Sequence, residues 1–265
     1  PPIASKYQVR VGTNYRLKGG TLYDVAEINQ HPRYNPRIDD YDFGIMRLSK
    51  PLIYGKRVQP IRLPNSYDIV RDGALLMASG YGRTKNPRDS YTRLHAVLLR
   101  KINFSKCLEA FEHKQYIVTP SMFCAGSKNN KRDSCKGKNE TGGDSGGPIV
   151  KGKLQVGIIS WGYKCAIRGY PGVYALIVSA RDWIKKKMFV LLFYTAFVVR
   201  LFEAYSFNST YDGGKIVKGF LIDIEDVPYQ VEIEFEERHI CGGSIISRQY
   251  ILTAAHCLTL SLVIF

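Results

Sequence analysis

The strongest chemical signal in this sequence is a serine enclosed by glycines, in residues 142–148, which read GGDSGGP. Glycines on both sides of Ser145 permit a tight turn that presents the hydroxyl and uncovers backbone N–H groups. Such N–H groups can stabilise an oxyanion, so the pattern indicates a nucleophilic serine beside an anion-binding site. A glycine-rich turn that contains a serine by chance is the alternative interpretation.

Two other segments place a histidine and an aspartate next to apolar stretches. His256 lies near the end of residues 252–257 (LTAAHC), and Asp42 opens residues 42–48 (DFGIMRL). Taken singly, either residue is more often structural than catalytic. Together with Ser145 they are the three side chains of a nucleophile, a general base and an orienting carboxylate.

The three segments together resemble the trypsin family of serine proteases, whose motifs G-D-S-G-G-P, T-A-A-H-C and D-I-A-L hold the catalytic residues. The resemblance implies that Ser145 attacks the carbonyl, His256 takes and returns the proton, and Asp42 fixes the imidazole tautomer. It also implies an oxyanion hole made by the backbone N–H groups of Gly143 and Ser145. Hydrolysis of peptide bonds is the activity that follows.

The same resemblance implies a substrate pocket. Asp133 matches the position at the base of the pocket in members that cleave after Lys or Arg, because a buried carboxylate needs a charged partner. The expected walls are Ser160, Trp161, Gly162 and Gly172, and the two glycines leave room for a long side chain. The alternative is that Asp133 is a surface aspartate in a loop rich in lysine and arginine.

Cysteine usage indicates an oxidising compartment. The chain has 6 cysteines with no zinc-type spacing, and three N-x-S/T sequons begin at Asn103, Asn139 and Asn208. Both features favour a secreted, extracellular protein with disulfides. The resemblance to the family implies the pairs Cys107–Cys124, Cys135–Cys165 and Cys241–Cys257, which leave no cysteine over.

The resemblance also implies activation from a zymogen. Family members are cut before an Ile-Val pair, and here Lys215 precedes Ile216. The ammonium group that cleavage frees on Ile216 is expected to pair with Asp144 and to shape the pocket. Lys218 departs from the glycine that is usual at that place.

The elements that position these residues are expected to be mostly strands. Gly, Pro and Asn separate many short strand-like stretches, a pattern typical of a barrel or sandwich. The resemblance specifies an all-β fold of two antiparallel six-stranded β-barrels, with the active site between them and a short helix near residues 179–187. The strand-like stretches are residues 7–11, 45–48, 75–79, 96–102, 154–161, 227–235 and 243–255.

Three regions divide the chain. Residues 1–187 correspond to most of a family domain, and residues 216–265 to its beginning plus a short apolar tail. Between them, residues 188–215 resemble a signal peptide followed by a propeptide. The apolar part of this segment contains Arg200 and Glu203 and is short for a membrane span, so no stable span is expected. A buried strand or helix is the alternative for it.

The order of the catalytic residues is unusual. The family has His, Asp and Ser in sequence, whereas here the order is Asp42, Ser145, His256. One explanation is a circular permutation, which surface-loop termini tolerate well. The other is a fusion of two related neighbouring genes. The internal Met188 and its signal-like stretch favour the fusion.

An insertion is the second departure from the family pattern. The family has C-x-G-D-S-G-G-P, but here six extra residues, 138–143, separate Gly137 from Asp144. They either form an outward loop or disturb the oxyanion hole. The second outcome would make the protein a catalytically inactive homologue that acts as a binding protein.

The charge distribution indicates which partners the protein binds. The net charge is +15, and residues 1–187 hold 33 Lys and Arg against 14 Asp and Glu. The basic residues are scattered and form no stripe with aromatics, so a solvated face is expected rather than binding to nucleic acid, with polyanion binding as an alternative. We expect a monomer that binds Lys/Arg-containing protein or peptide substrates and protein protease inhibitors. No cofactor or metal is expected, because the loop after Val11 lacks the paired acids of the family's calcium site.

Overall fold

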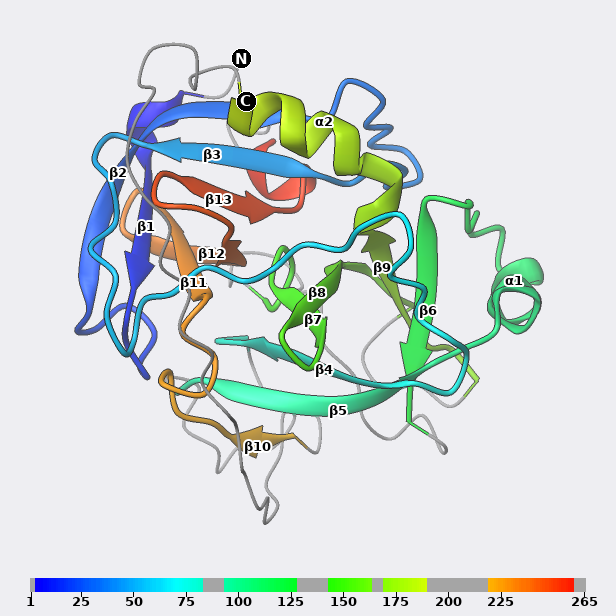
Figure 1. The fold of residues 1–265 in the computed structure, drawn as a ribbon. Coiled ribbons are helices and arrows are strands. Elements are labelled where there is room, and N and C mark those ends of the chain that lie inside the picture. The colour runs from blue at the N-terminus through cyan, green and yellow to red at the C-terminus, as the bar shows by residue number, and fades with distance from the viewer. Residues whose placement is uncertain (1–2, 83–92, 128–142, 164–168, 190–218, 260–265) are drawn as a thin grey trace.

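The computed structural model describes residues 3–82, 93–127, 143–163, 169–189 and 219–259. Within these ranges the chain forms two antiparallel β-barrels that pack side by side, with one helix across the first barrel and one at the edge of the second (Figure 1). The fold predicted from the sequence is confirmed.

The first barrel contains strands from both ends of the chain, in the closed order β1-β11-β12-β13-β3-β2. β1 pairs with β11 in the register Tyr7↔Phe235 and with β2 on its other side. Residues 230–253 therefore complete this barrel. Its strands are β1 (Tyr7–Val11), β2 (Thr21–Gln30), β3 (Gly44–Leu48), β11 (Gln230–Phe235), β12 (Arg238–Ile245) and β13 (Tyr250–Thr253).

The second barrel comes from the middle of the chain. Its six strands run in the order β5-β4-β7-β8-β9-β6, and pairing of β5 with β6 closes the ring. The short strand β10 (Phe220–Leu221) adds to the outer edge of β5. The six strands are β4 (Leu75–Gly80), β5 (His95–Lys101), β6 (Met122–Gly126), β7 (Pro148–Lys151), β8 (Leu154–Trp161) and β9 (Gly172–Leu176).

Side-chain alternation explains how these strands build two cores. Tyr7, Val9 and Val11 of β1 point into the first barrel, while the residues between them are partly exposed. In β8 every residue is buried, because one face lines the second barrel and the other faces neighbouring structure. Such a two-sided strand reads as an almost continuous apolar run.

Two α-helices flank the barrels. α1 (Phe104–Glu112) begins at Asn103, whose side chain accepts a hydrogen bond from the backbone N–H of Ser105 at 3.0 Å. This cap satisfies one of the N–H groups that the first turn leaves without a partner. α2 (Ile177–Phe189) contains the predicted helix of residues 179–187 and extends past both of its ends. Two 3₁₀ turns, η1 (Ala4–Lys6) and η2 (His256–Leu258), complete the described elements.

The predicted strand positions agree closely with the structure, with two exceptions: residues 227–235, of which only 230–235 form β11, and residues 243–255. Residues 7–11 and 154–161 have the predicted bounds, and the stretches near 45, 75 and 96 differ by a residue at their ends. Residues 243–255 are not one strand: they hold the end of β12, a turn and β13. Arg248 and Gln249 occupy that turn, where β12 folds back onto β13.

Candidate active site

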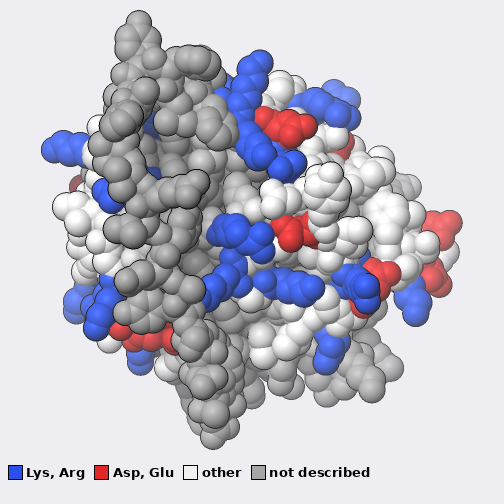
Figure 2. All heavy atoms as spheres, in the orientation of Figure 1, with Lys and Arg blue, Asp and Glu red and all other residues white. Residues whose placement is uncertain are grey.

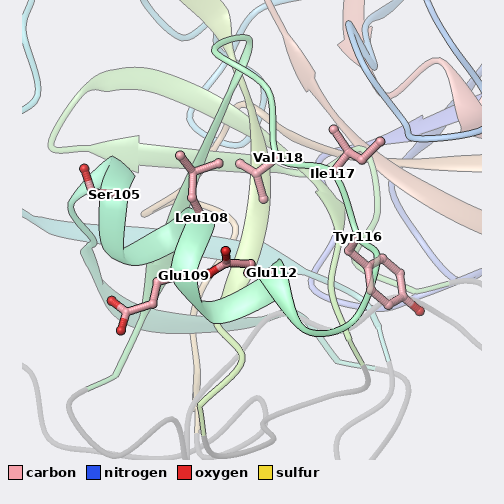
Figure 3. A pocket seen from close by; sticks show the side chains of 7 residues that line it. All are labelled: Ser105, Leu108, Glu109, Glu112, Tyr116, Ile117 and Val118. Atoms are coloured by element: carbon pink, nitrogen blue, oxygen red, sulfur yellow. The ribbon is translucent and has the colours of Figure 1, made fainter.

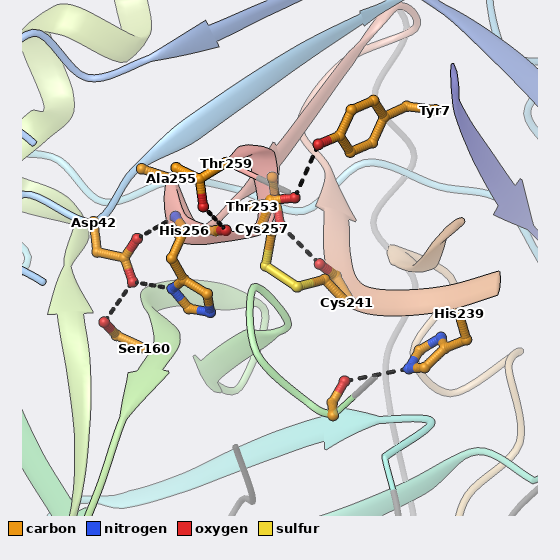
Figure 4. The surroundings of a disulfide bond; sticks show 12 residues. Tyr7, Asp42, Ser160, His239, Cys241, Thr253, Ala255, His256, Cys257 and Thr259 are labelled. Carbon is orange, nitrogen blue, oxygen red and sulfur yellow. Dashed lines mark hydrogen bonds and ion pairs between the residues drawn. A yellow bond between two sulfur atoms is a disulfide. The ribbon is translucent and has the colours of Figure 1, made fainter. Parts of the chain in front are cut away.

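Asp42 is the buried centre of the site. It lies two residues before β3 and has no exposed surface. Its Oδ2 accepts hydrogen bonds from Ser160 Oγ at 2.6 Å and from His256 Nδ1 at 2.7 Å, and its Oδ1 accepts from the backbone N–H of His256 at 3.0 Å (Figure 4). Three donors thus hold one carboxylate in place.

These contacts fix the charge of Asp42 and the tautomer of His256. Burial by itself raises the pKa of Asp42, but attraction to His256 and hydrogen bonds from His256 and Ser160 outweigh it, so the pKa lies below its usual value. An ionised carboxylate only accepts, so Nδ1 of His256 carries the proton that it donates. Nε2 is then left with the lone pair of a general base and points away from Asp42 (Figure 4).

His256 reaches Asp42 through strand pairing. β13 pairs with β3 in the register Thr253↔Gly44, so the residues that follow β13 emerge beside those that precede β3. Gly44 permits the approach, because a Cβ at this position would lie 2.5 Å from Leu258 Cδ1 and 3.0 Å from Ala254 O. The disulfide between Cys241 and Cys257 ties the turn that carries His256 to β12.

Ser145 lies on the turn that precedes β7. Its backbone carbonyl accepts a hydrogen bond from Gly242 N at 2.8 Å, and the next N–H, that of Gly146, donates to Ile159 O at 2.8 Å. The Ser145 side chain is buried, and its Oγ has no hydrogen-bond partner among the described residues. A hydroxyl without a fixed partner is available to a base, although no direct bond between it and His256 is formed in the described structure.

The glycine after Ser145 is required by two features of the turn. Gly146 has a φ of +80°, in the region that glycine adopts most readily. A Cβ there would lie 2.2 Å from Thr253 Oγ1 and 2.5 Å from Gly242 O. The serine-bearing turn is therefore pressed directly against β12 and β13 of the first barrel.

Asp144 is buried on the other side of this turn. Its Oδ1 accepts a hydrogen bond from Gly82 N at 2.9 Å, and a Cβ on Gly80 or Gly82 would come within 2.6 Å of that oxygen. Its proposed partner in activation, Ile216, lies outside the described residues together with Lys215.

The expected pocket walls lie together at the end of β8 and the start of β9. Among the described residues, a Cβ on Gly162 would meet only the Cα of Gly172, at 3.9 Å, so these residues leave open space beside Gly162. Trp161 stacks on Tyr116 and contacts Phe111 edge-on. Asp133, the expected base of the pocket, lies outside the described residues.

One contact was not anticipated from the sequence. Ser160 was expected only as a pocket wall, but its hydroxyl donates to Asp42. Its position 118 residues after Asp42 carries no local signal of that contact. The disulfides Cys107–Cys124 and Cys241–Cys257 are present as predicted, and Cys135–Cys165 lies outside the described residues.

Two groups of side chains could in principle face a metal ion among the described residues. One joins His256 with Cys241 and Cys257, whose sulfurs are bonded to each other and offer no thiolate. The other joins His256 and Asp42 with Asp39, all of whose ligand atoms lie within 4.8 Å of one another. In that group Asp42 and His256 already hydrogen-bond to each other.

A separate depression lies on α1 and the segment after it (Figure 3). It has a volume of about 400 Å³ and is lined by Ser105, Leu108, Glu109, Glu112, Tyr116, Ile117 and Val118. None of these is a predicted site residue, and no residue of the Asp42–His256–Ser145 group lines it. The site described above does not depend on it.

Comparison with known families gives a match over most of the chain. The family model described as Trypsin matches residues 3–184 and 216–263. The two matched segments leave out the signal-like and propeptide-like region between them. Both contribute to the site, since the first holds Asp42 and Ser145 and the second holds His256.

Individual proteins are also similar in sequence to this chain. Trypsin 5G1 of Aedes aegypti is 40% identical over 183 residues, 68% of this chain and 65% of that protein. A vitellin-degrading protease of Bombyx mori is 35% identical over 182 residues, 69% of this chain and 66% of that protein. Trypsin-3 of Salmo salar is 36% identical over 189 residues, 69% of this chain and 74% of that protein. The chain thus spans just under two thirds of the first two relatives.

Proposed function

Because this chain belongs to the trypsin family, we propose that it is a serine endopeptidase that hydrolyses peptide bonds after Lys or Arg. The observation that carries the proposal is the contact of His256 with the buried Asp42, made across 214 residues of sequence. A buried carboxylate with three donors, one of them on a histidine whose second nitrogen is free to act as a base, is the arrangement that general-base catalysis requires.

The proposed mechanism gives each residue a defined role. His256 Nε2 removes the proton of Ser145 Oγ as the oxygen attacks the substrate carbonyl, and a tetrahedral oxyanion forms. The backbone N–H groups of Gly143 and Ser145 stabilise it. His256 then gives the proton to the leaving amine, and an acyl-enzyme on Ser145 remains. Water, activated by His256, hydrolyses the ester and restores the hydroxyl. Asp42 stays ionised throughout and stabilises the imidazolium.

Specificity and activation are part of the same proposal. The space between Gly162 and Gly172 supports a pocket for a long side chain. Asp133 at its base would favour Lys or Arg, and cleavage after Lys215 would free Ile216 to pair with Asp144. We further propose a secreted monomer that meets protein substrates and protein inhibitors. Among the described helices, none has the length and apolar character needed to cross a membrane.

Chain order is the unusual part of the proposal. We propose that residues 1–187 and 216–265 form one protease domain, with residues 188–215 between them. The pairing of β1 with β11 and of β3 with β13 supports closure of the first barrel by the far end of the chain. A gene fusion remains our interpretation of how this order arose, and it does not conflict with a single folded domain.

Hydrolysis kinetics test the function. The full chain, cut after Lys215, is assayed with Lys, Arg and Phe esters, beside Ser145→Ala and the exposed control Ser49→Ala. We expect turnover of the Lys and Arg esters that Ser145→Ala abolishes and Ser49→Ala leaves unchanged. A folded chain that binds benzamidine but turns over no ester would favour the inactive homologue, for which the six-residue insertion is the supporting observation.

Polyanion binding is the remaining alternative. Lys and Arg side chains gather across the middle of the face in Figure 2, with fewer acidic ones among them. Several basic residues are in ion pairs, such as Arg57 with Glu225 and Lys101 with Asp72. Exposed charges of this kind are screened by salt. Heparin binding that persists at about 0.5 M salt would support this alternative.

A further inference from the structure

A second buried histidine touches the serine-bearing turn. His239 lies on β12 and is 5% exposed. Its Nδ1 is 2.9 Å from Glu232 Oε1, and its Nε2 is 3.3 Å from the backbone carbonyl oxygen of Gly143. Figure 4 shows its ring on the far side of the Cys241–Cys257 disulfide from His256. The mechanism above gives this residue no role.

Glu232 anchors the other side of the ring. Its carboxylate is completely buried, and its Oε2 accepts a hydrogen bond from the backbone N–H of Leu17 at 2.8 Å. Arg10 Nε lies 3.7 Å from the same oxygen and also pairs with Glu234 at 2.6 Å. The backbone N–H of Leu17 and the guanidinium of Arg10 therefore hold the Glu232 carboxylate in place beside the ring.

The surroundings of the ring define its hydrogen bonds. A carboxylate and a carbonyl are both acceptors, so each ring nitrogen satisfies its neighbour only when it carries a proton. The ring of His239 thus lies between two acceptors, Glu232 on one side and Gly143 on the other. The ring of Tyr81 faces it edge-on at 6.5 Å, and the other charged groups packed around the pair are Arg10 and Glu234.

This bond acts on the part of the chain proposed to form the oxyanion hole. The carbonyl that His239 holds belongs to Gly143, one of the two proposed oxyanion donors. Glycine has wide conformational freedom, so an N–H on Gly143 keeps its direction only if the adjoining peptide is fixed. Three residues along the same strand, Gly242 N donates to the carbonyl of Ser145. β12 thus holds both ends of the turn from 143 to 145.

We propose that His239, held by Glu232, is a positioning residue that sets the direction of the oxyanion-stabilising N–H groups. The inference rests on the proposed protease function. It adds a buried histidine–glutamate pair to that site and predicts that the pair affects the tetrahedral intermediate more than the bound substrate. A group that stabilises only the transition state changes kcat, whereas one that holds the substrate equally in both states changes KM.

The test separates these effects with four variants of the full chain. His239→Phe removes both hydrogen bonds, and His239→Gln retains a donor that can reach Gly143. Glu232→Gln removes the charge that holds the ring. Glu234→Gln is the matched control, because Glu234 is on the same strand as Glu232, is buried and pairs with Arg10, yet its carboxylate forms no hydrogen bond or ion pair with His239, which lies opposite it on β12. Thermal melting shows whether each variant is folded.

Four quantities are measured for each variant: kcat and KM on an Arg ester, the Kd of benzamidine, and the Kd of an arginine aldehyde that forms a tetrahedral adduct. We expect His239→Phe to lower kcat by roughly 10- to 100-fold and to weaken the aldehyde in parallel, with benzamidine within about 2-fold, because small misplacements of catalytic groups have effects of this size. His239→Gln should recover part of the loss. Glu232→Gln should resemble His239→Phe, and Glu234→Gln the parent.

Two results would overturn the inference. One is a folded His239→Phe variant whose kcat stays within about 2-fold of the parent, since loss of a donor of this kind costs far more. The other is any sign of a general structural role. Such a sign is an equal loss of kcat in Glu232→Gln and Glu234→Gln, or parallel losses of benzamidine and aldehyde binding. A parent chain without Ser145-dependent turnover would instead contradict the proposed function, and is recognised before any variant is compared.

Discussion

A methyl group added at Gly146 should separate backbone strain from collision at the serine-bearing turn. Gly146 has a φ of +80°, and an alanine there pays about 1–2 kcal/mol for the left-handed backbone. The added Cβ would also lie 2.2 Å from Thr253 Oγ1 and 2.5 Å from Gly242 O. Neither atom moves freely, because Thr253 donates to that carbonyl at 2.8 Å. Overpacking of this kind destabilises the fold by about a further 1–3 kcal/mol.

The chain contains a matched control for this substitution. Gly152, in the turn between β7 and β8, has a φ of +56°, and a Cβ there would meet nothing within 4 Å. Gly152→Ala therefore carries the backbone strain without the collision. We expect it to lower the free energy of unfolding by about 1 kcal/mol. Gly146→Ala should lower it by about 3 kcal/mol, the sum of the two effects.

Thermal unfolding and active-site labelling measure the two consequences. For a domain of this size about 1 kcal/mol corresponds to roughly 2–4 °C in Tm, so Gly146→Ala should melt roughly 6–12 °C below the parent and Gly152→Ala roughly 2–4 °C below it. A fluorophosphonate should label Ser145 at the normal rate in Gly152→Ala and much more slowly in Gly146→Ala. Equal Tm losses with equal labelling would refute the claim that the turn is pressed against β12 and β13.

Three further predictions concern the loss of stability at low pH and the substrate pocket. The pKa of Asp42 in the folded protein lies below its unfolded value of 3.8. Its contribution to stability is therefore complete above pH 3.8 and is lost as the pH falls through the folded pKa. Ser160→Ala removes one donor to this carboxylate and should shift that loss to higher pH in acid-unfolding curves. Burial, then repulsion from Arg33, lowers the pKa of His31 from 6.5, so the unfolded chain takes up a proton first and stability should fall as the pH drops below 6.5; a His31→Phe variant whose stability keeps the same slope there would contradict this. Gly162→Val fills the space beside Gly172, so KM for an Arg ester should rise by roughly tenfold or more, while KM for an alanine ester changes little. An unchanged ratio of the two KM values would place the pocket elsewhere.

Local patterns predicted the strands and the helix well, because alternation and turn residues are read from neighbouring positions. The β8 strand, residues 154–161, has the predicted bounds for this reason. The helix α1 was missed, although it carries two local signals. Asn103, its cap, was interpreted as a glycosylation sequon, and the helical spacing of Phe104, Cys107, Leu108 and Phe111 was not used. Reading residues 243–255 as one stretch failed because both strands on either side of the turn are apolar.

The site was predicted by resemblance, and its contacts were not. The bond of His256 to Asp42 spans 214 residues, and the bond of His239 to Gly143 spans 96. The first depends on the pairing of β13 with β3 in the first barrel, and the second on the packing of β12 against the turn that precedes β7 of the second barrel. No local pattern encodes either. Ser160 is a similar case, since its hydroxyl, on β8 of the second barrel, reaches Asp42 of the first only when the two barrels pack together.

The central claim is that His256, brought from the far end of the chain, activates Ser145 through its bond to Asp42. Fluorophosphonate labelling of the full chain cut after Lys215 tests it most directly, with His256→Ala compared with the buried control His95→Ala, whose side chain bonds to the carbonyl of Arg93. We expect rapid labelling of Ser145 in the parent and in His95→Ala, and at least a hundredfold slower labelling in His256→Ala, roughly the share of catalysis that a general base supplies. Equal labelling rates in the parent and in His256→Ala would contradict the account.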